Sequence, residues 1–172
     1  MIRRCKLAEF DDICAVVNDA AAAYRGIIAA DRWNDPYMSL GELRREVDDA
    51  VLFWGSFEGG QLNAVMGLQY VGSVALVRHA YTRSANQGMG IGRALLAHLR
   101  DQTDRPMLVG TWKAATWAVR FYQGQGFRLV PGQKRDALLR RYWTVPERQI
   151  EESVVLADVR WFATSSTTPD GA

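Results

Sequence analysis

The segment NQGMGIGR, residues 86–93, carries glycines at positions 88, 90 and 92. The apolar, strand-like run VALVRHAYT precedes it at 74–82, and the helical pattern ALLAHLR follows directly at 94–100. Glycine is unfavourable near a helix start unless the chain needs an unusual conformation or a close backbone approach. Unpaired N–H groups and the helix dipole attract anions at such a start. The segment therefore predicts a phosphate-binding turn between a strand and a helix.

Two common phosphate motifs do not fit this spacing. The dinucleotide motif G-x-G-x-x-G would need a third glycine where Arg93 or Leu95 stands, depending on the starting glycine. The P-loop motif needs a Gly-Lys pair, and the chain contains none. A nucleotide-binding α/β domain of another kind stays open as an alternative, but these two fingerprints do not support it.

The remaining sequence predicts a mixed α/β fold. The helical spacing of Ile13, Val16 and Val17, the Ser39 cap with Glu42 three residues later, and the Gly59-Gly60 turn predict two helices and a hairpin. Strands then alternate with helices, and RQIEESVVLA at 148–157 is predicted to be the last strand. Early hairpins followed by βαβ units indicate a mixed sheet. We expect one domain over residues 1–158 and a disordered polar tail over residues 159–172.

Composition limits the classes of function. The 172 residues carry a net charge of only +2, which does not favour a nucleic-acid partner. The basic residues between Lys134 and Arg148 favour a solvated face over an anion site. The two cysteines form no C-x-x-C pair, so no metal is expected. Without a signal-like segment or an 18-residue apolar run, the sequence predicts a cytoplasmic protein with no membrane partner.

Two blocks of the sequence resemble one family. Gln87-x-x-Gly90-x-Gly92 is similar to the [Q/R]-x-x-G-x-[G/A] motif of the GNAT superfamily of acyl-CoA-dependent N-acetyltransferases, and AVRFYQGQGF at 118–127 resembles that family's later A-[IV]-x-F-Y-x-x-x-G-F block. The resemblance covers roughly residues 2–157. It implies a GNAT-like, mostly antiparallel central sheet that is flanked by helices and splayed between the fourth and fifth strands. One departure is Ala115, where the family often has an asparagine that contacts pantetheine.

The resemblance also implies a donor site for acetyl-CoA as co-substrate, with no metal. Backbone groups on the fourth strand would bind the pantetheine arm, and the glycine loop would wrap the pyrophosphate. The strand residues are Ala80, Tyr81 and Thr82; the loop residues are Gln87, Gly88, Met89, Gly90, Ile91, Gly92 and Arg93.

The implied reaction is direct transfer of an acetyl group to a primary amine of a small molecule or peptide, in a ternary complex. Tyr122 matches the family tyrosine that often donates a proton to the leaving sulfur. A phenol of pKa about 10 is a weaker acid than a thiol of pKa about 8.5, which favours a hydrogen bond to the thiolate over full protonation. The alternative is a structural tyrosine packed in the core.

His79 is a candidate general base because an imidazole titrates near neutral pH. Alternation along a strand predicts that Arg78 and His79 face opposite sides, so His79 would be a core residue if it faces inward. Glu151 and Glu152, expected on the last strand, are the next candidates, and a water chain is a further alternative.

The acceptor is expected near residues 24–37, YRGIIAADRWNDPY. Its aromatic residues Tyr24, Trp33 and Tyr37, with carboxylates at 31 and 35, suit a cationic amine, although buried aromatics could simply anchor the loop. A catalytically weak domain that binds acyl-CoA as a sensor or interaction module is the alternative function. A homodimer is also left open, because many members of the family pair through their last strands.

Overall fold

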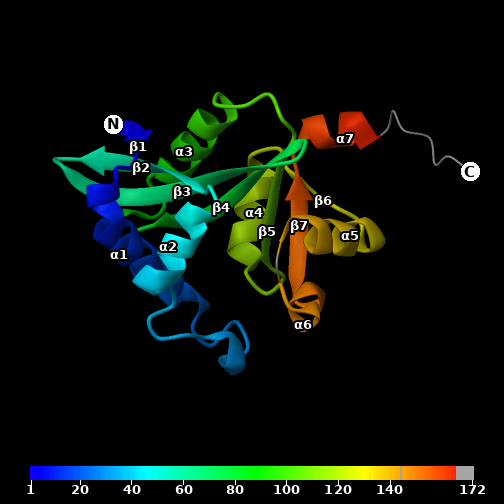
Figure 1. Ribbon diagram of the computed structural model, residues 1–172, viewed down its shortest axis with the longest axis horizontal. Helices are drawn as coiled ribbons and strands as arrows, with labels where there is room; N and C mark the ends of the chain where they lie inside the picture. The colour runs from blue at the N-terminus through cyan, green and yellow to red at the C-terminus, as the bar shows by residue number, and fades with distance from the viewer. Residues whose placement is uncertain (144, 166–172) are drawn as a thin grey trace, which may run out of the picture. The chain divides into compact units, whose positions relative to one another are not determined.

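The computed structural model describes residues 1–143 and 145–165, and its described strands form one mixed sheet (Figure 1). The strand order is β1-β2-β3-β4-β5-β7-β6, with β4 and β5 parallel and most other neighbours antiparallel. The strands are β1 (Ile2–Arg4), β2 (Leu52–Glu58), β3 (Gln61–Val71), β4 (Val74–Thr82), β5 (Met107–Trp112), β6 (Arg128–Leu129) and β7 (Ser153–Ala157). The predicted fold class is confirmed.

The described chain is organised in two compact units, and the first comprises residues 1–70 and 77–104. It holds the antiparallel strands β1, β2 and β3, most of β4, and the helices α1 (Phe10–Ala21), α2 (Leu40–Asp48) and α3 (Ile91–Arg100). Successive residues of a strand point to opposite faces. Phe53 accordingly packs in a core with α1 and α2, while the neighbouring Trp54 contacts His98 of α3. Helices therefore cover both faces of this part of the sheet.

The start of α2 is fixed by the predicted capping box. The Ser39 hydroxyl accepts a hydrogen bond from Glu42 N at 3.2 Å, and the Glu42 carboxylate accepts one from Ser39 N at 2.7 Å. Two N–H groups that the helix itself leaves unpaired are thereby satisfied. Leu43 follows directly and is fully buried, so the cap sets the position at which α2 enters the core.

Replacing Ser39 by alanine should lower the free energy of unfolding by about 1 kcal/mol, because the cap to Glu42 N is lost. For a chain of this length, the melting temperature should fall by about 2–4 °C. Ser39→Asp is the matched control, since aspartate caps as well as serine. A Ser39→Ala protein that melts with the wild type would show that the capping box contributes nothing measurable.

The second unit comprises residues 71–76 together with the described residues from 105 onward. Strands β5 and β6 both pair antiparallel with β7, and Ala75 N, at the start of β4, donates to Pro106 O at 2.9 Å. The helices are α4 (Thr116–Gly124), α5 (Gly132–Tyr142), α6 (Glu147–Glu151) and α7 (Val159–Ser165). Whether the two units form one domain, as the sequence predicts, stays a prediction, and so does the splaying between β4 and β5.

The end of the chain differs from the expectation in two places. Residues 148–157 are not one strand: α6 occupies the first half and only Ser153–Ala157 forms β7. Pro146, at the N-cap, has a dihedral angle that suits a helix start, and Ser153 Oγ donates to Gln149 O at 2.7 Å. Glu151 and Glu152 therefore lie at the end of a helix and not on the last strand.

The predicted tail begins with a helix. Residues 159–165 form α7, in which Trp161 and Phe162 pack against the core of the second unit. The Asp158 carboxylate caps the N-terminus of α7, because Oδ1 accepts a hydrogen bond from Trp161 N at 3.2 Å. Residues 166–172 lie outside the described part of the chain. None of the described helices is long and apolar enough to cross a membrane.

Candidate active site

The glycine loop after β4 depends on two left-handed backbone positions. Gly88 and Gly90 have φ angles of +77° and +79°, a region that residues with a side chain rarely adopt. A Cβ atom at either position would meet no other atom within 4 Å. Conformation therefore selects glycine here, while the space above the backbone is open to a ligand.

The loop ends in an open helix start. Gly90 is the N-cap of α3, and no described side chain caps the helix. The first helical hydrogen bond runs from Ala94 N to Gly90 O at 3.0 Å, which leaves the N–H groups of Ile91, Gly92 and Arg93 without a helical acceptor. Residues 87–90 are exposed. Together with the helix dipole, these N–H groups can bind a phosphate.

Hydrogen bonds at the end of β4 anchor the glycine loop. Arg83 donates from its backbone to Asn63 O at 2.9 Å, and Ser84 N donates to Asp19 Oδ2 on α1 at 2.6 Å. The Gln87 side chain donates back to Thr82 O at 3.2 Å. The roles of Asp19 and Arg83 were not predicted, because both residues read as ordinary polar surface positions in the sequence.

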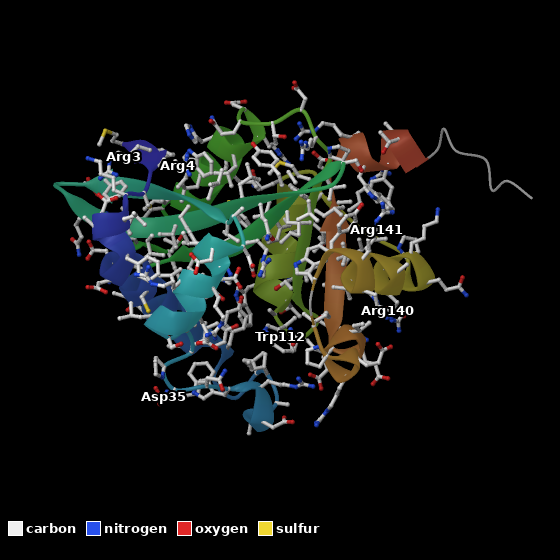
Figure 2. The ribbon with its side chains drawn as sticks, viewed as in Figure 1. Arg3, Arg4, Asp35, Trp112, Arg140 and Arg141 are labelled. Carbon is white, nitrogen blue, oxygen red and sulfur yellow. The ribbon has the colours of Figure 1, made fainter. Side chains whose placement is uncertain are left out.

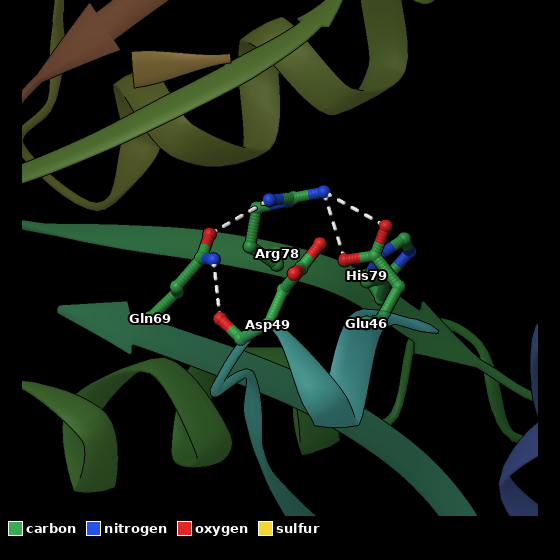
Figure 3. Close-up of polar contacts among 5 residues, drawn as sticks. All are labelled: Glu46, Asp49, Gln69, Arg78 and His79. Atoms are coloured by element: carbon green, nitrogen blue, oxygen red, sulfur yellow. Dashed lines mark hydrogen bonds and ion pairs between the residues drawn. The ribbon is translucent and has the colours of Figure 1, made fainter. Parts of the chain in front are cut away.

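Arg78 and His79 do not face opposite sides as the alternation rule predicts. His79 has a φ of +48°, and the side chains of both residues reach Glu46 on α2 (Figure 3). Arg78 donates to both carboxylate oxygens, at 3.0 and 2.8 Å, and His79 Nε2 lies 2.9 Å from Glu46 Oε2. The left-handed residue breaks the alternation, so His79 is a half-buried partner of a carboxylate and not a residue surrounded only by apolar core.

Glu46 remains ionised in this setting. Burial is the largest single effect and raises its pKa, but the contacts with His79 and Arg78 together outweigh burial and leave the pKa below its usual value. The carboxylate is thus a fixed negative charge beside His79. Sequence reasoning missed Glu46, which lies 32 positions before Arg78 and carries no motif of its own.

The aromatic residues of the segment 24–37 cluster around Tyr81 of β4. Tyr24 and Tyr37 stack with ring centroids 5.9 Å apart, and both meet the Tyr81 ring edge-on at 6.4 Å. Trp33 joins the cluster through Tyr37, at 5.5 Å. The predicted acceptor segment therefore contacts the strand that carries the predicted pantetheine residues.

The charges of this segment partly satisfy each other. Asp35, labelled in Figure 2, accepts a hydrogen bond from Arg25 at 3.3 Å, and the Arg25 guanidinium lies 4.9 Å from the centre of the Trp33 ring. Both side chains of the ion pair are largely exposed. The aromatic surface thus already binds one cation of the protein itself, which is the chemistry expected for a cationic amine.

Tyr122 belongs to the second unit, where it is 4% exposed. Its ring meets those of Phe121 at 5.0 Å and Phe127 at 5.6 Å, so the three aromatic residues of the block at 118–127 pack together. Ala115 is the buried N-cap of α4 and offers no side-chain cap. The predicted cofactor residues and His79 are thus gathered in the first unit, and Tyr122 in the second.

Two arginines of the basic stretch between Lys134 and Arg148 form ion pairs. Arg140 pairs with Glu147 and Arg135 with Asp136, and Figure 2 shows Arg140 and Arg141 on α5. These contacts support the interpretation as a solvated face. Among the described residues, no group of three or more histidine, cysteine, aspartate or glutamate side chains could hold a metal ion.

The fourth strand of the mixed sheet leads into a left-handed glycine loop and an uncapped helix start, an arrangement that can bind a phosphate group. The model of the acetyltransferase (GNAT) domain matches residues 18–138, which is more than half of the chain. The chain belongs to this family.

Solved structures show the same fold. The chain is similar to the PaiA N-acetyltransferase of Thermoplasma acidophilum in complex with coenzyme A, with a TM-score of 0.69 and 16% identity over 92% of this chain and 97% of that one.

Two further structures agree. The ribosomal-protein-alanine N-acetyltransferase of Brucella melitensis has a TM-score of 0.59 and 21% identity over 76% of this chain and 86% of that one. YncA of Salmonella typhimurium with acetyl-CoA has a TM-score of 0.58 and 20% identity over 76% of this chain and 80% of that one. A search of curated protein sequences found no significant match.

Proposed function

We propose that the protein transfers an acetyl group from acetyl-CoA to a primary amine of a small molecule or peptide, directly and in a ternary complex. The observation that carries the proposal is the loop 87–93, with its two left-handed glycines and uncapped helix start on the family's motif. Membership of the acetyltransferase family supports it, as do similar proteins that were solved with coenzyme A or acetyl-CoA.

In this proposal, the pyrophosphate binds the N–H groups of the glycine loop and the pantetheine arm extends along β4. Backbone groups of Ala80, Tyr81 and Thr82 would hydrogen-bond the arm in the manner of an added strand. A backbone N–H of Ala80 or Tyr81 would also stabilise the oxyanion that forms on the thioester carbon. The anchoring of the loop through Asp19 and Arg83 would keep these groups in register.

The state of the cysteines favours direct transfer over an acetyl-cysteine intermediate. Burial raises the pKa of Cys5 to about 12, and it also raises the pKa of Cys14. A thiol must ionise to act as a nucleophile, so neither cysteine is suited to accept the acetyl group at neutral pH. The amine itself is then the attacking group.

Proton transfer is assigned to two residues. His79 would accept the proton of the attacking amine, and Tyr122 would hydrogen-bond the sulfur as the thiolate develops. Glu151 and Glu152 are weaker candidates for the base, since they lie at the end of α6 and not on the last strand. A water chain in place of a dedicated base is the remaining alternative.

The acceptor amine is assigned to the aromatic cluster of Tyr24, Trp33, Tyr37 and Tyr81. The cluster lies against β4, where the pantetheine arm would end. Its aromatic faces and the nearby carboxylate of Asp35 suit a cationic group. We therefore expect amines that carry a second positive charge or an aromatic group to react best.

A coenzyme-release assay with acetyl-CoA tests the proposal. The panel should contain aliphatic monoamines, polyamines, free amino acids and peptides with an N-terminal alanine. We expect saturable release of coenzyme A with at least one class. Calorimetry that detects no binding of acetyl-CoA would exclude the proposal. Tight binding with no turnover on any amine would favour the sensor function. The one hint of that function is Ala115, which stands where the family often has an asparagine.

A further inference from the structure

The carboxylate of Glu46 is held in place by a hydrogen-bonded chain that the motifs do not predict. Arg78 binds both of its oxygens and also donates to Gln69 Oε1 at 2.8 Å (Figure 3). Gln69 in turn donates to Asp49 O at 2.8 Å, just beyond the end of α2. The chain links α2, β3 and β4 at one point. Both oxygens of the carboxylate are therefore bound by a guanidinium that Gln69 also contacts.

His79 turns toward the same carboxylate at a cost in backbone energy. A left-handed φ is unfavourable at a residue with a side chain, and such strain persists where surrounding contacts enforce it. Here the His79 ring lies on Phe53, with ring centroids 5.9 Å apart and an angle of 29° between the planes. Ring packing on one side and Glu46 on the other fix the imidazole.

The chemistry of the pair specifies which ring nitrogen carries the hydrogen. An ionised carboxylate only accepts hydrogen bonds, so the nitrogen that faces it must be a donor. Nε2 is buried and lies 2.9 Å from Glu46 Oε2, although its N–H is not aligned for a good hydrogen bond in this structure. In the neutral ring, a hydrogen on Nε2 suits this contact with the carboxylate and would leave the lone pair on Nδ1.

Arg78 balances the charge of Glu46. A lone carboxylate would stabilise the imidazolium form of His79, which cannot accept a proton. The Arg78 guanidinium, bound to both oxygens, offsets part of that attraction. Arg45 also lies close enough to act on Glu46. The Glu46 carboxylate is therefore shared between Arg78 and His79.

We propose that Glu46 is a positioning residue for catalysis: it holds His79 as the Nε2–H tautomer, so that Nδ1 accepts the proton of the attacking amine. This inference rests on the proposed acetyl transfer with His79 as base. The amine nitrogen forms a bond to the thioester carbon and gives one proton to Nδ1. The C–S bond then breaks with its electron pair on sulfur, and the thiolate takes up one proton as His79 releases one.

Kinetics separate positioning from mere structural support. With the best amine of the panel, Glu46→Gln should lower kcat/KM about tenfold. The acidic limb of the pH profile of kcat/KM should move to lower pH. The affinity for acetyl-CoA should stay within twofold of the wild-type value. His79→Gln should abolish that limb. Because Glu46 acts through His79, the double variant should be no slower than His79→Gln alone.

Glu9→Gln is the matched control. Glu9 is also a glutamate paired with an arginine, Arg3, and it lies outside the proposed site. Its pH profile should match that of the wild type. A Glu46→Gln profile that overlays the wild type, or losses that multiply in the double variant, would overturn the inference.

Nitrogen NMR of the imidazoles gives a readout that needs no activity. The chain has two histidines, so a His98→Gln protein displays His79 alone. We expect the neutral ring to be the Nε2–H tautomer only, and a measurable Nδ1–H fraction to appear when Glu46→Gln is added. A mixed tautomer with Glu46 present overturns the inference. If the wild type acetylates no amine, the proposed acetyl transfer is wrong. The nitrogen spectrum then shows by itself whether Glu46 holds His79 as the Nε2–H tautomer.

Discussion

Replacing Gly90 by aspartate should weaken acetyl-CoA binding by about a hundredfold. Two unit charges 4 Å apart repel by about 1 kcal/mol in water and about 4 kcal/mol at an effective dielectric constant of 20, and the helix start lies between these limits. The new carboxylate would sit where the pyrophosphate is expected to meet the N–H groups of α3. Isothermal titration calorimetry with acetyl-CoA measures the loss.

The control for this variant must preserve the backbone strain. Gly90 has a φ of +79°, so any side chain is strained there. Asparagine has the size of aspartate, tolerates this region better than most residues and carries no charge. Gly90→Asn should therefore retain most of the affinity, and the difference between the two variants reports the charge alone.

Two further measurements locate the effect on the pyrophosphate. The difference between Gly90→Asp and Gly90→Asn should shrink as salt is added, because residues 87–90 are exposed. It should vanish for S-acetylpantetheine, which lacks the pyrophosphate. Equal affinities of the two variants for acetyl-CoA at low salt would contradict the proposed phosphate site.

The glycine loop was predictable because its cause is local. A strand pattern, three closely spaced glycines and a helix pattern follow each other within residues 74–100, and each of these signals depends on neighbouring residues. The capping box of α2 is equally local, with Ser39 and Glu42 three positions apart. Such features can be read from the sequence because no distant contact is needed to form them.

The surroundings of His79 could not be predicted in this way. Alternation assumes regular strand geometry, whereas His79 has a left-handed φ and contacts Phe53 and Glu46, which come from other elements. The contacts of Tyr81 could not be predicted either. The aromatic residues of the segment 24–37 were expected to form the acceptor site, but their contact with Tyr81 of β4 depends on the tertiary fold. The error over α6 arose because its apolar residues are too few to define a period.

Tyr122→Phe should lower kcat by about tenfold to a hundredfold, with little change in the affinity for acetyl-CoA. A hydrogen bond to a charged group contributes about 1.5–3 kcal/mol, and here the charge develops on sulfur only as the C–S bond breaks. Phenylalanine keeps the ring contacts with Phe121 and Phe127, so the core of this unit should stay packed. Steady-state kinetics and calorimetry separate the two effects.

The matched control is Tyr70→Phe. Tyr70 also uses its hydroxyl for a hydrogen bond, to Gln102 O at 3.1 Å, but it lies outside both family motifs. Its kcat should equal that of the wild type. If Tyr122 is only structural, Tyr122→Phe should lower the melting temperature and leave kcat unchanged.

The acidity of the leaving thiol decides how the Tyr122 hydroxyl acts. A thiol more acidic than that of coenzyme A leaves as a more stable thiolate and needs less help from a donor. The ratio of wild-type to Tyr122→Phe kcat should therefore fall toward one as acetyl thioesters of increasingly acidic thiols replace acetyl-CoA. A ratio that stays constant across the series would mean that Tyr122 acts before the C–S bond breaks, and would exclude a contact with the developing thiolate.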